Sequence, residues 1–155
     1  MDDRTQPALD GVAIQLFADD VDTTTLPLSI TIAREGGMSV VMIPRDTALP
    51  TGHRETFSTA TENQGSIDVH VYIGERAFCR DNLSVGRFSI VDIPDAPAGL
   101  PLFEVSFEVD EQRMFRLSAT NIATGEAQPM LTVDSLATPL TAATLASIRA
   151  RLGLD

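Results

Sequence analysis

The chain has 155 residues, 43% of them hydrophobic, which is enough for one domain with its own core and too few for two. Its 22 acidic and 11 basic residues give a formal charge of -11, a field that repels phosphate backbones and argues against nucleic acid as a partner. One cysteine, Cys79, excludes an internal disulfide, and no apolar run approaches the roughly 20 residues that span a bilayer, so we expect a cytoplasmic protein with no membrane partner.

The first 26 residues predict an acidic, flexible N-terminal linker. They hold acids, threonines and one short apolar patch at residues 12–17, followed by Asp19, Asp20 and Asp22. A calcium loop needs alternating oxygen ligands with a glycine and a terminal glutamate, and this segment lacks that pattern. We therefore interpret the three aspartates as solvated charges.

From Pro27 the sequence changes to short runs rich in valine, isoleucine and phenylalanine, separated by turn residues. This spacing is typical of an antiparallel all-β domain. We expect a mainly β fold, a two-layer antiparallel β-sandwich, occupying residues 27–135. About eight strands are predicted, at residues 28–33, 38–43, 54–60, 66–73, 86–92, 102–109, 114–119 and 127–133.

Two of these runs alternate strictly between apolar and polar residues. Residues 67–73 place Ile67, Val69, Val71 and Ile73 on one face, and residues 103–109 turn Glu104, Ser106 and Glu108 towards water. Such alternation indicates strands with one buried face.

Glycine and proline mark the connections between strands. Gly36 and Gly37 predict a tight connection, because glycine adopts positive φ without a Cβ clash. Residues 94–101 contain three prolines, each lacking the ladder donor, and are expected to form a long surface loop.

Residues 136–155 are predicted to contain a short C-terminal helix. Leu145, Ile148 and Leu152 have helical spacing, Thr141 is a suitable N-cap, and Gly153 is a suitable stop.

Side chains suited to catalysis are sparse. A nucleophilic triad needs a nucleophile, a base and an orienting acid, and neither His53 nor His70 lies in a signature context. Two separated histidines and one cysteine do not match the spacing of a zinc site, and no glycine-rich loop with a lysine is present to hold a phosphate. We expect no catalytic residues, no metal and no cofactor. Cys79 beside Arg80 is a conceivable redox group, but packing is the favoured role.

A series of short motifs occurs in a fixed order between Pro27 and Ala119. The motifs are Pro27-Leu28-Ser29, Gly36-Gly37, Leu49-Pro50-Thr51, Phe57-Ser58-Thr59-Ala60, Asn63-Gln64, Gly74-Glu75-Arg76, Asp81-Asn82, Gly86-Arg87-Phe88, Ile93-Pro94, Ala96-Pro97, Gly99-Leu100-Pro101, Glu104-Val105, Phe107 and Ser118-Ala119. In this order and spacing they resemble the peptide-binding β-domain of the DnaK-type, 70-kilodalton heat-shock chaperones.

The resemblance implies two stacked sheets with a groove for a short, extended, apolar-centred peptide. Backbone hydrogen bonds would supply general affinity and side-chain pockets would supply preference. Ser58 and Thr59 would belong to the loop that contacts the peptide backbone, and Glu35 and Ala60 would form an arch over it, with Arg34 beside Glu35. The pocket wall implied by the resemblance is Ile32, Phe57, Ile67, Val69 and Phe103.

Several residues depart from the family pattern. Glu35 replaces an apolar arch residue, and this change favours peptides with basic flanks. Ile67 and Phe103 are larger than expected, which predicts a narrowed or filled pocket. Arg113 stands where a turn glycine is common, which predicts a different turn. The polar stretch at residues 20–26 replaces the leucine-rich linker of the family, which predicts loss of coupling to nucleotide.

The resulting functional hypothesis is chaperone-like binding of extended, apolar peptide segments of unfolded or client proteins, without an ATPase domain or a helical lid of its own. One alternative is a detached substrate-binding part of a chaperone that works with an ATPase domain on a separate chain. Another is a non-chaperone interaction domain whose groove is filled and which binds one dedicated partner. Self-association through the groove is a further possible mode of partnership.

Overall fold

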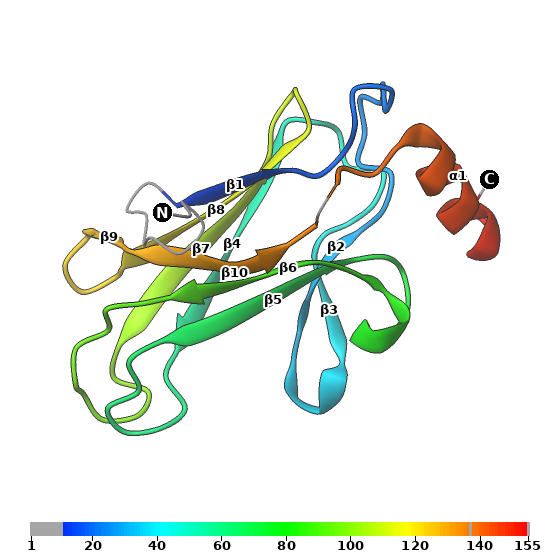
Figure 1. Ribbon diagram of the computed structural model, residues 1–155. Coiled ribbons are helices and arrows are strands. Elements are labelled where there is room, and N and C mark those ends of the chain that lie inside the picture. Colours follow the sequence, from blue (N-terminus) through cyan, green and yellow to red (C-terminus); the bar gives the residue numbers. More distant parts are fainter. Residues whose placement is uncertain (1–10, 137, 155) are drawn as a thin grey trace.

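The computed structural model describes residues 11–136 and 138–154. Within these residues the chain forms ten strands in two antiparallel sheets and one α-helix, which confirms the predicted mainly β sandwich (Figure 1). The strands are β1 (Val12–Gln15), β2 (Ile30–Ala33), β3 (Ser39–Ile43), β4 (Thr51–Ser58), β5 (Ile67–Ile73), β6 (Leu83–Ile90), β7 (Leu102–Val109), β8 (Met114–Asn121), β9 (Ala127–Gln128) and β10 (Met130–Ser135).

The first sheet has the order β1-β8-β7-β4, with β9 also paired to β8. The second has the order β10-β6-β5-β2-β3. The last predicted strand is divided in two, because Pro129 lacks the N–H that would continue the ladder. At this proline the chain passes from the first sheet, where Gln128 lies opposite Ala119, to the second, where Met130 lies opposite Ile90.

Residues before Pro27 contribute to the sandwich, whereas the sequence led us to expect a flexible linker there. Strand β1 pairs antiparallel with β8, with Val12 opposite Leu117. Leu16 and Phe17 follow it and are 0% and 1% exposed. The apolar patch noted in the sequence is therefore an edge strand followed by core residues.

The core lies between the two sheets and follows the alternation seen in the sequence. On β5 the buried residues are Ile67, Val69, Val71 and Ile73, and on β7 they are Phe103, Val105, Phe107 and Val109. Fully burying a side chain of this size stabilises a fold by about 1.5–3 kcal/mol. These two strands anchor the sandwich, as expected.

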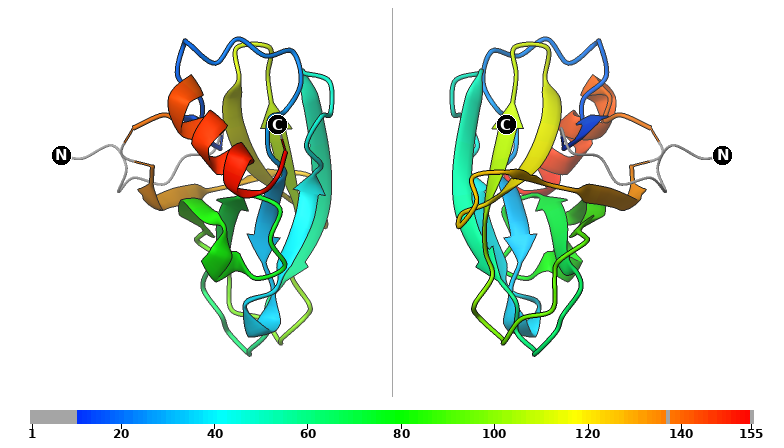
Figure 2. Two further views of the ribbon diagram at one scale, coloured as in Figure 1. Left: turned by 90° about the vertical axis from the view of Figure 1, so that its right-hand side faces the viewer. Right: turned by 90° about the vertical axis from the view of Figure 1, so that its left-hand side faces the viewer.

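Helix α1 (Ala142–Arg151) lies beside the sandwich, away from the loops at its lower end (Figure 2). The Thr141 hydroxyl accepts a hydrogen bond from the backbone N–H of Thr144, which confirms the predicted N-cap. Asp20 adds a second cap, since its carboxylate accepts from the N–H of Ala142 at 3.1 Å. Leu145, 5% exposed, attaches the helix to the core.

The connections β2–β3, β4–β5 and β6–β7 all reach the lower end of the molecule in Figure 1. The first is a short 3-10 turn, Glu35–Gly37, in which Gly36 and Gly37 have φ of 76° and 75°. This is the tight connection that the two glycines predicted. No helix among the described residues is long and apolar enough to cross a membrane.

Candidate functional site

A cavity of about 740 Å³ opens between β3 and β4 at the loop end of the sandwich. Its walls come from β2, the β2–β3 turn, β3, β4 and the start of β5. The lining residues are Ile32, Ala33, Arg34, Met38, Val40, Glu55, Thr56, Phe57, Ser58 and Asp68.

The two strands that flank this cavity are both edge strands. β4 ends the first sheet and β3 ends the second. An edge strand presents backbone N–H and C=O groups that no neighbouring strand uses. Residues 77 and 78 cover part of the outer edge of β3, where the N–H of Ser39 donates to the carbonyl of Ala77 at 2.9 Å. Along β4 the described residues form a ladder with β7 only.

The floor of the cavity is apolar and well supported. Ile32 is 3% exposed, and Phe57 and Val40 are partly buried against the core. The Phe57 ring also packs against Phe107, with the ring centroids 6.4 Å apart. Phe57 therefore presents one part of its ring to the cavity while core residues hold the other.

Charged groups stand at the rim. The Arg34 guanidinium lies 3.8 Å from the Glu55 carboxylate, and both residues line the cavity. Asp68 accepts a hydrogen bond from the Ser89 hydroxyl at 3.1 Å, which orients its carboxylate. The rim thus carries two carboxylates and one guanidinium, an excess of negative charge.

The structure brings four of the sequence-predicted site residues to this cavity: Ile32, Arg34, Phe57 and Ser58. Ile67, Val69 and Phe103 belong instead to the core between the sheets, with exposures of 6%, 2% and 0%. Phe103 lies opposite Phe57 in the β4–β7 ladder, so it supports this region from the inside.

Thr59 and Ala60 follow Ser58 in the β4–β5 loop, which is hydrogen-bonded to the β6–β7 loop. The Ser58 hydroxyl donates to the carbonyl of Pro101. Gly99 N–H donates to the Thr59 carbonyl at 3.0 Å and contacts its hydroxyl at 3.1 Å. The side chains of Ser58 and Thr59 thus bind the β6–β7 loop, and their contact with a peptide backbone stays a prediction. The side chain of Glu35, the other predicted arch residue, lies outside the described part of the structure.

Gln64 organises the same loop. Its side-chain oxygen accepts from the backbone N–H of Ala60 at 2.9 Å and of Thr61 at 3.2 Å, while its amide donates to the Ser66 carbonyl at 2.7 Å. The Asn63-Gln64 motif marked this position in the sequence, although no role could be assigned to it there. Nothing in their local pattern distinguishes the lining residues that were missed, which are Ala33, Met38, Val40, Glu55, Thr56 and Asp68.

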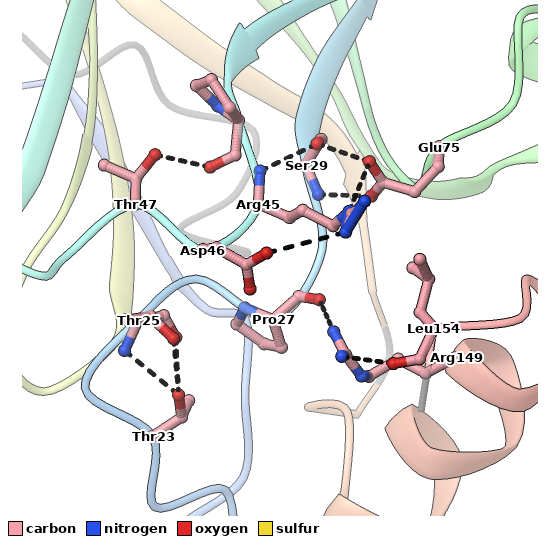
Figure 3. Close-up of polar contacts among 11 residues, drawn as sticks. Thr23, Thr25, Pro27, Ser29, Arg45, Asp46, Thr47, Glu75, Arg149 and Leu154 are labelled. Atoms are coloured by element: carbon pink, nitrogen blue, oxygen red, sulfur yellow. Dashed lines mark hydrogen bonds and ion pairs between the residues drawn. The ribbon is translucent and has the colours of Figure 1, made fainter.

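A second polar cluster lies at the opposite end of β2 (Figure 3). The Glu75 carboxylate accepts from the backbone N–H and the hydroxyl of Ser29, both at 2.7 Å, and lies 3.6 Å from the Arg45 guanidinium. Ser29 Oγ also accepts from the backbone N–H of Arg45 at 2.9 Å. These contacts fasten the β3–β4 and β5–β6 connections to the start of β2. Every charged group in the cluster has a partner, which indicates a structural role.

No group of three or more histidine, cysteine, aspartate or glutamate side chains in the described residues is arranged to hold a metal ion. Cys79 is buried, and burial raises the pKa of its thiol above the ordinary value. A buried thiol with a raised pKa is a weak nucleophile, in keeping with the packing role expected from the sequence.

Comparison with known proteins decides the family. The family model described as Hsp70 protein matches residues 16–149, which include every strand except β1 and most of α1. The chain belongs to the Hsp70 family. It is also similar to the chaperone protein DnaK of Methanothermobacter thermautotrophicus, with 42% identity over 124 residues. That alignment covers 76% of this chain and 21% of the DnaK, so this Hsp70 chain spans about a fifth of the relative's length.

Proposed function

We propose that this chain binds short, extended, apolar segments of unfolded or client proteins in the cavity between β3 and β4. The observation that carries the proposal is the position of a cavity of about 740 Å³ at the edges of both sheets, with apolar side chains at its floor and polar or charged ones at its rim. An extended peptide there meets unpaired backbone groups on β4 and apolar side chains below. This combination matches peptide recognition by strand addition, in which backbone bonds give affinity and pockets give preference.

The charges at the rim support a preference for peptides with basic flanks. Glu55 and Asp68 line the cavity, and Arg34 offsets only one of them. A lysine or arginine beside the apolar centre of a peptide can approach the carboxylates, whereas an acidic flank is repelled. This preference was first expected from Glu35 and now rests on two further acidic residues.

The family and the relative named chaperone protein DnaK support a role in client binding. We propose that the segment itself hydrolyses no nucleotide, acts in the cytoplasm and needs no cofactor. An ATPase domain on a separate chain stays the first alternative. A filled groove, the second alternative, is less well supported, because Ile67 and Phe103 occupy the core and leave the cavity beside Phe57 open.

The test is binding of a fluorescein-labelled peptide with a Leu-Val run between basic residues, measured by fluorescence anisotropy. Phe57→Ser removes the aromatic ring from the cavity floor and should weaken binding about tenfold or more, because the peptide loses its main apolar contact. The matched control is Ile122→Ser, at an exposed apolar residue outside this cavity. Ile67 is unsuitable for such a test, since a change there disrupts the core.

The unfolding midpoint of each variant shows whether the fold is retained. Unchanged affinity in a folded Phe57→Ser protein places the peptide elsewhere. Absence of binding to the unsubstituted chain at high protein concentration contradicts the open groove. An equal loss of affinity in Ile122→Ser also contradicts the proposal.

A further inference from the structure

A second apolar hollow lies on the other side of the β6–β7 loop, between this loop and the β8–β9 turn. Its volume is about 400 Å³, within the range of roughly 300–1,000 Å³ that is usual for ligand pockets. We call it the loop-end surface. Apart from Asn121, its lining residues are apolar, and the principal ones are Pro94, Leu100, Pro101, Leu102, Phe103 and Ile122.

Large apolar side chains at this surface face solvent. Leu100 is 67% exposed, Ile122 47% and Leu102 43%. Single exposed apolar residues are ordinary, but a contiguous group that lines a hollow marks an interaction site. Phe103 lines the hollow and belongs to the core, so core packing supports the floor.

Backbone groups around the loop-end surface are already used within the chain. The N–H of Ile122 donates to the carbonyl of Leu102 at 3.0 Å, and the N–H of Leu100 donates to Pro97 at 3.2 Å. Pro94 and Pro101 have no N–H to offer. An extended peptide therefore gains little by strand addition here. A helix, whose backbone groups are bonded internally, can fit such a surface through side chains alone.

Three acidic residues adjoin the lining residues of this surface along the chain or across the β8–β9 turn. Asp95 lies between the lining residues Pro94 and Ala96. The backbone carbonyl of Glu126 accepts a hydrogen bond from the backbone N–H of the lining residue Asn121. Glu104 lies two residues after Leu102, on the same face of β7, and its carboxylate forms an ion pair with Arg54 at 3.7 Å. Among the described residues, Asp95 and Glu126 form no ion pair. The complement of this field is a cationic ligand.

We propose that the loop-end surface docks a basic amphipathic helix of a partner protein. The apolar side chains of that helix, spaced one turn apart, pack against Leu100, Leu102 and Ile122. Its lysines or arginines face Asp95, Glu104 and Glu126. This partner is distinct from the extended client of the first cavity, because the two sites require different backbone conformations.

The two sites are also separated physically. The β4–β5 loop and the β6–β7 loop are joined by the hydrogen bonds of Asn63 N–H to Ala96 O at 2.8 Å and Ile93 N–H to Gly65 O at 3.2 Å, besides that of Gly99 to Thr59. These loops form a wall between the cavity and the loop-end surface. A helix at the latter should therefore leave the extended-peptide site accessible.

The experiment uses a fluorescein-labelled helical peptide with leucines on one face and lysines at both ends. A peptide of the same composition with the leucines scattered around the helix is the probe control. Anisotropy should show binding of the first peptide only. Ile122→Ser should weaken it about tenfold or more, while Val133→Ser, at a residue 50% exposed on β10, should leave it unchanged.

A saturating amount of the unlabelled extended peptide separates this proposal from the proposed function. Retention of the bound helical peptide supports a second site, and its displacement overturns that site. Equal binding of the scattered peptide, no binding at all, or an equal effect of Val133→Ser also overturns it. The helical peptide should bind Phe57→Ser normally, so loss of the first cavity and loss of the loop-end surface give different results.

Discussion

At the scale of single residues, His70 occupies an unusual position on the outer face of β5. Its Nδ1 lies 3.0 Å from the Tyr72 hydroxyl and its Nε2 lies 3.0 Å from the Ser84 hydroxyl. Burial lowers the pKa of His70 below its ordinary value, the Arg87 guanidinium lowers it further, and the Asp134 carboxylate partly offsets both. The neutral ring is thus the form that the folded chain favours.

The stability of the chain should therefore depend on pH through His70. His70 binds a proton near pH 6.5 in the unfolded chain and only at lower pH in the folded chain. Its contribution to the free energy of unfolding is therefore present above about pH 6.5 and is lost as the pH falls towards the lowered pKa. Urea unfolding between pH 5 and 8, about 1.5 units either side of that value, measures this change. His70→Gln should remove part of the slope. An unchanged slope in His70→Gln would exclude this residue as the source.

Some of the residues predicted for the site line the cavity and others lie in the core, for a physical reason. The alternation in β5 shows that Ile67 and Val69 share a face, but it cannot show whether that face covers a core or a cavity. The structure places both in the core, while Ile32 and Phe57, assigned through their motifs, do line the cavity. The sequence also predicted a different turn at Arg113, which stands where a turn glycine is common. Its φ of 65° is the conformation of a turn glycine, so the expected change of turn is not seen at this residue.

At the scale of elements, the least predictable contacts join the beginning of the chain to its end. Asp20 and Ala142 are 122 positions apart, and a local pattern carries no information about that distance. Leu16 and Leu140 are likewise joined, through a hydrogen bond from the N–H of Leu140 to the Leu16 carbonyl at 3.0 Å. The helix and its Thr141 cap were predictable from spacing, whereas the attachment of its N-terminal end to residues 16–20 was not.

Replacing Asp20 tests this docking. Asp20→Ala removes a carboxylate that accepts from the first turn of α1 and should lower the free energy of unfolding by about 0.5–1 kcal/mol. Asp22→Ala is the matched control, because the exposed Asp22 side chain has no hydrogen bond or ion pair among the described residues. Urea titration with circular dichroism gives both values. Equal effects would mean that net charge, and not the cap, determines the change.

At the scale of the whole molecule, the net charge of -11 acts on every approaching ligand. Cationic peptides should associate faster and bind more tightly at low ionic strength, since the Debye length shortens from about 30 Å at 0.01 M to about 10 Å at 0.1 M salt. We expect the affinity of the Lys-flanked extended peptide to fall as salt rises. The affinity of a peptide with the same Leu-Val centre and neutral flanks should change little. Parallel salt dependence of the two peptides would argue against recognition of basic flanks.

The sandwich as a whole was predictable, because alternation, turn residues and the ordered motifs all indicate one architecture. The division of the last strand was harder to foresee, since it depends on which sheet each half joins at Pro129. The strand β1 was missed because a short apolar patch among acids predicts an edge strand only when its neighbour, β8, is known.

The hydrogen bonds between the β4–β5 and β6–β7 loops have a thermodynamic consequence. Thr59 and Gly65 belong to one loop, Ile93 and Gly99 to the other, and a displacement of either loop must break or carry along these bonds. These loops separate the cavity from the loop-end surface. A ligand at one of these sites that binds one arrangement of the loops more tightly raises the population of that arrangement, and so changes the affinity of a ligand at the other site. Linkage makes this effect reciprocal: whatever factor a helix imposes on peptide affinity, the peptide imposes on the helix.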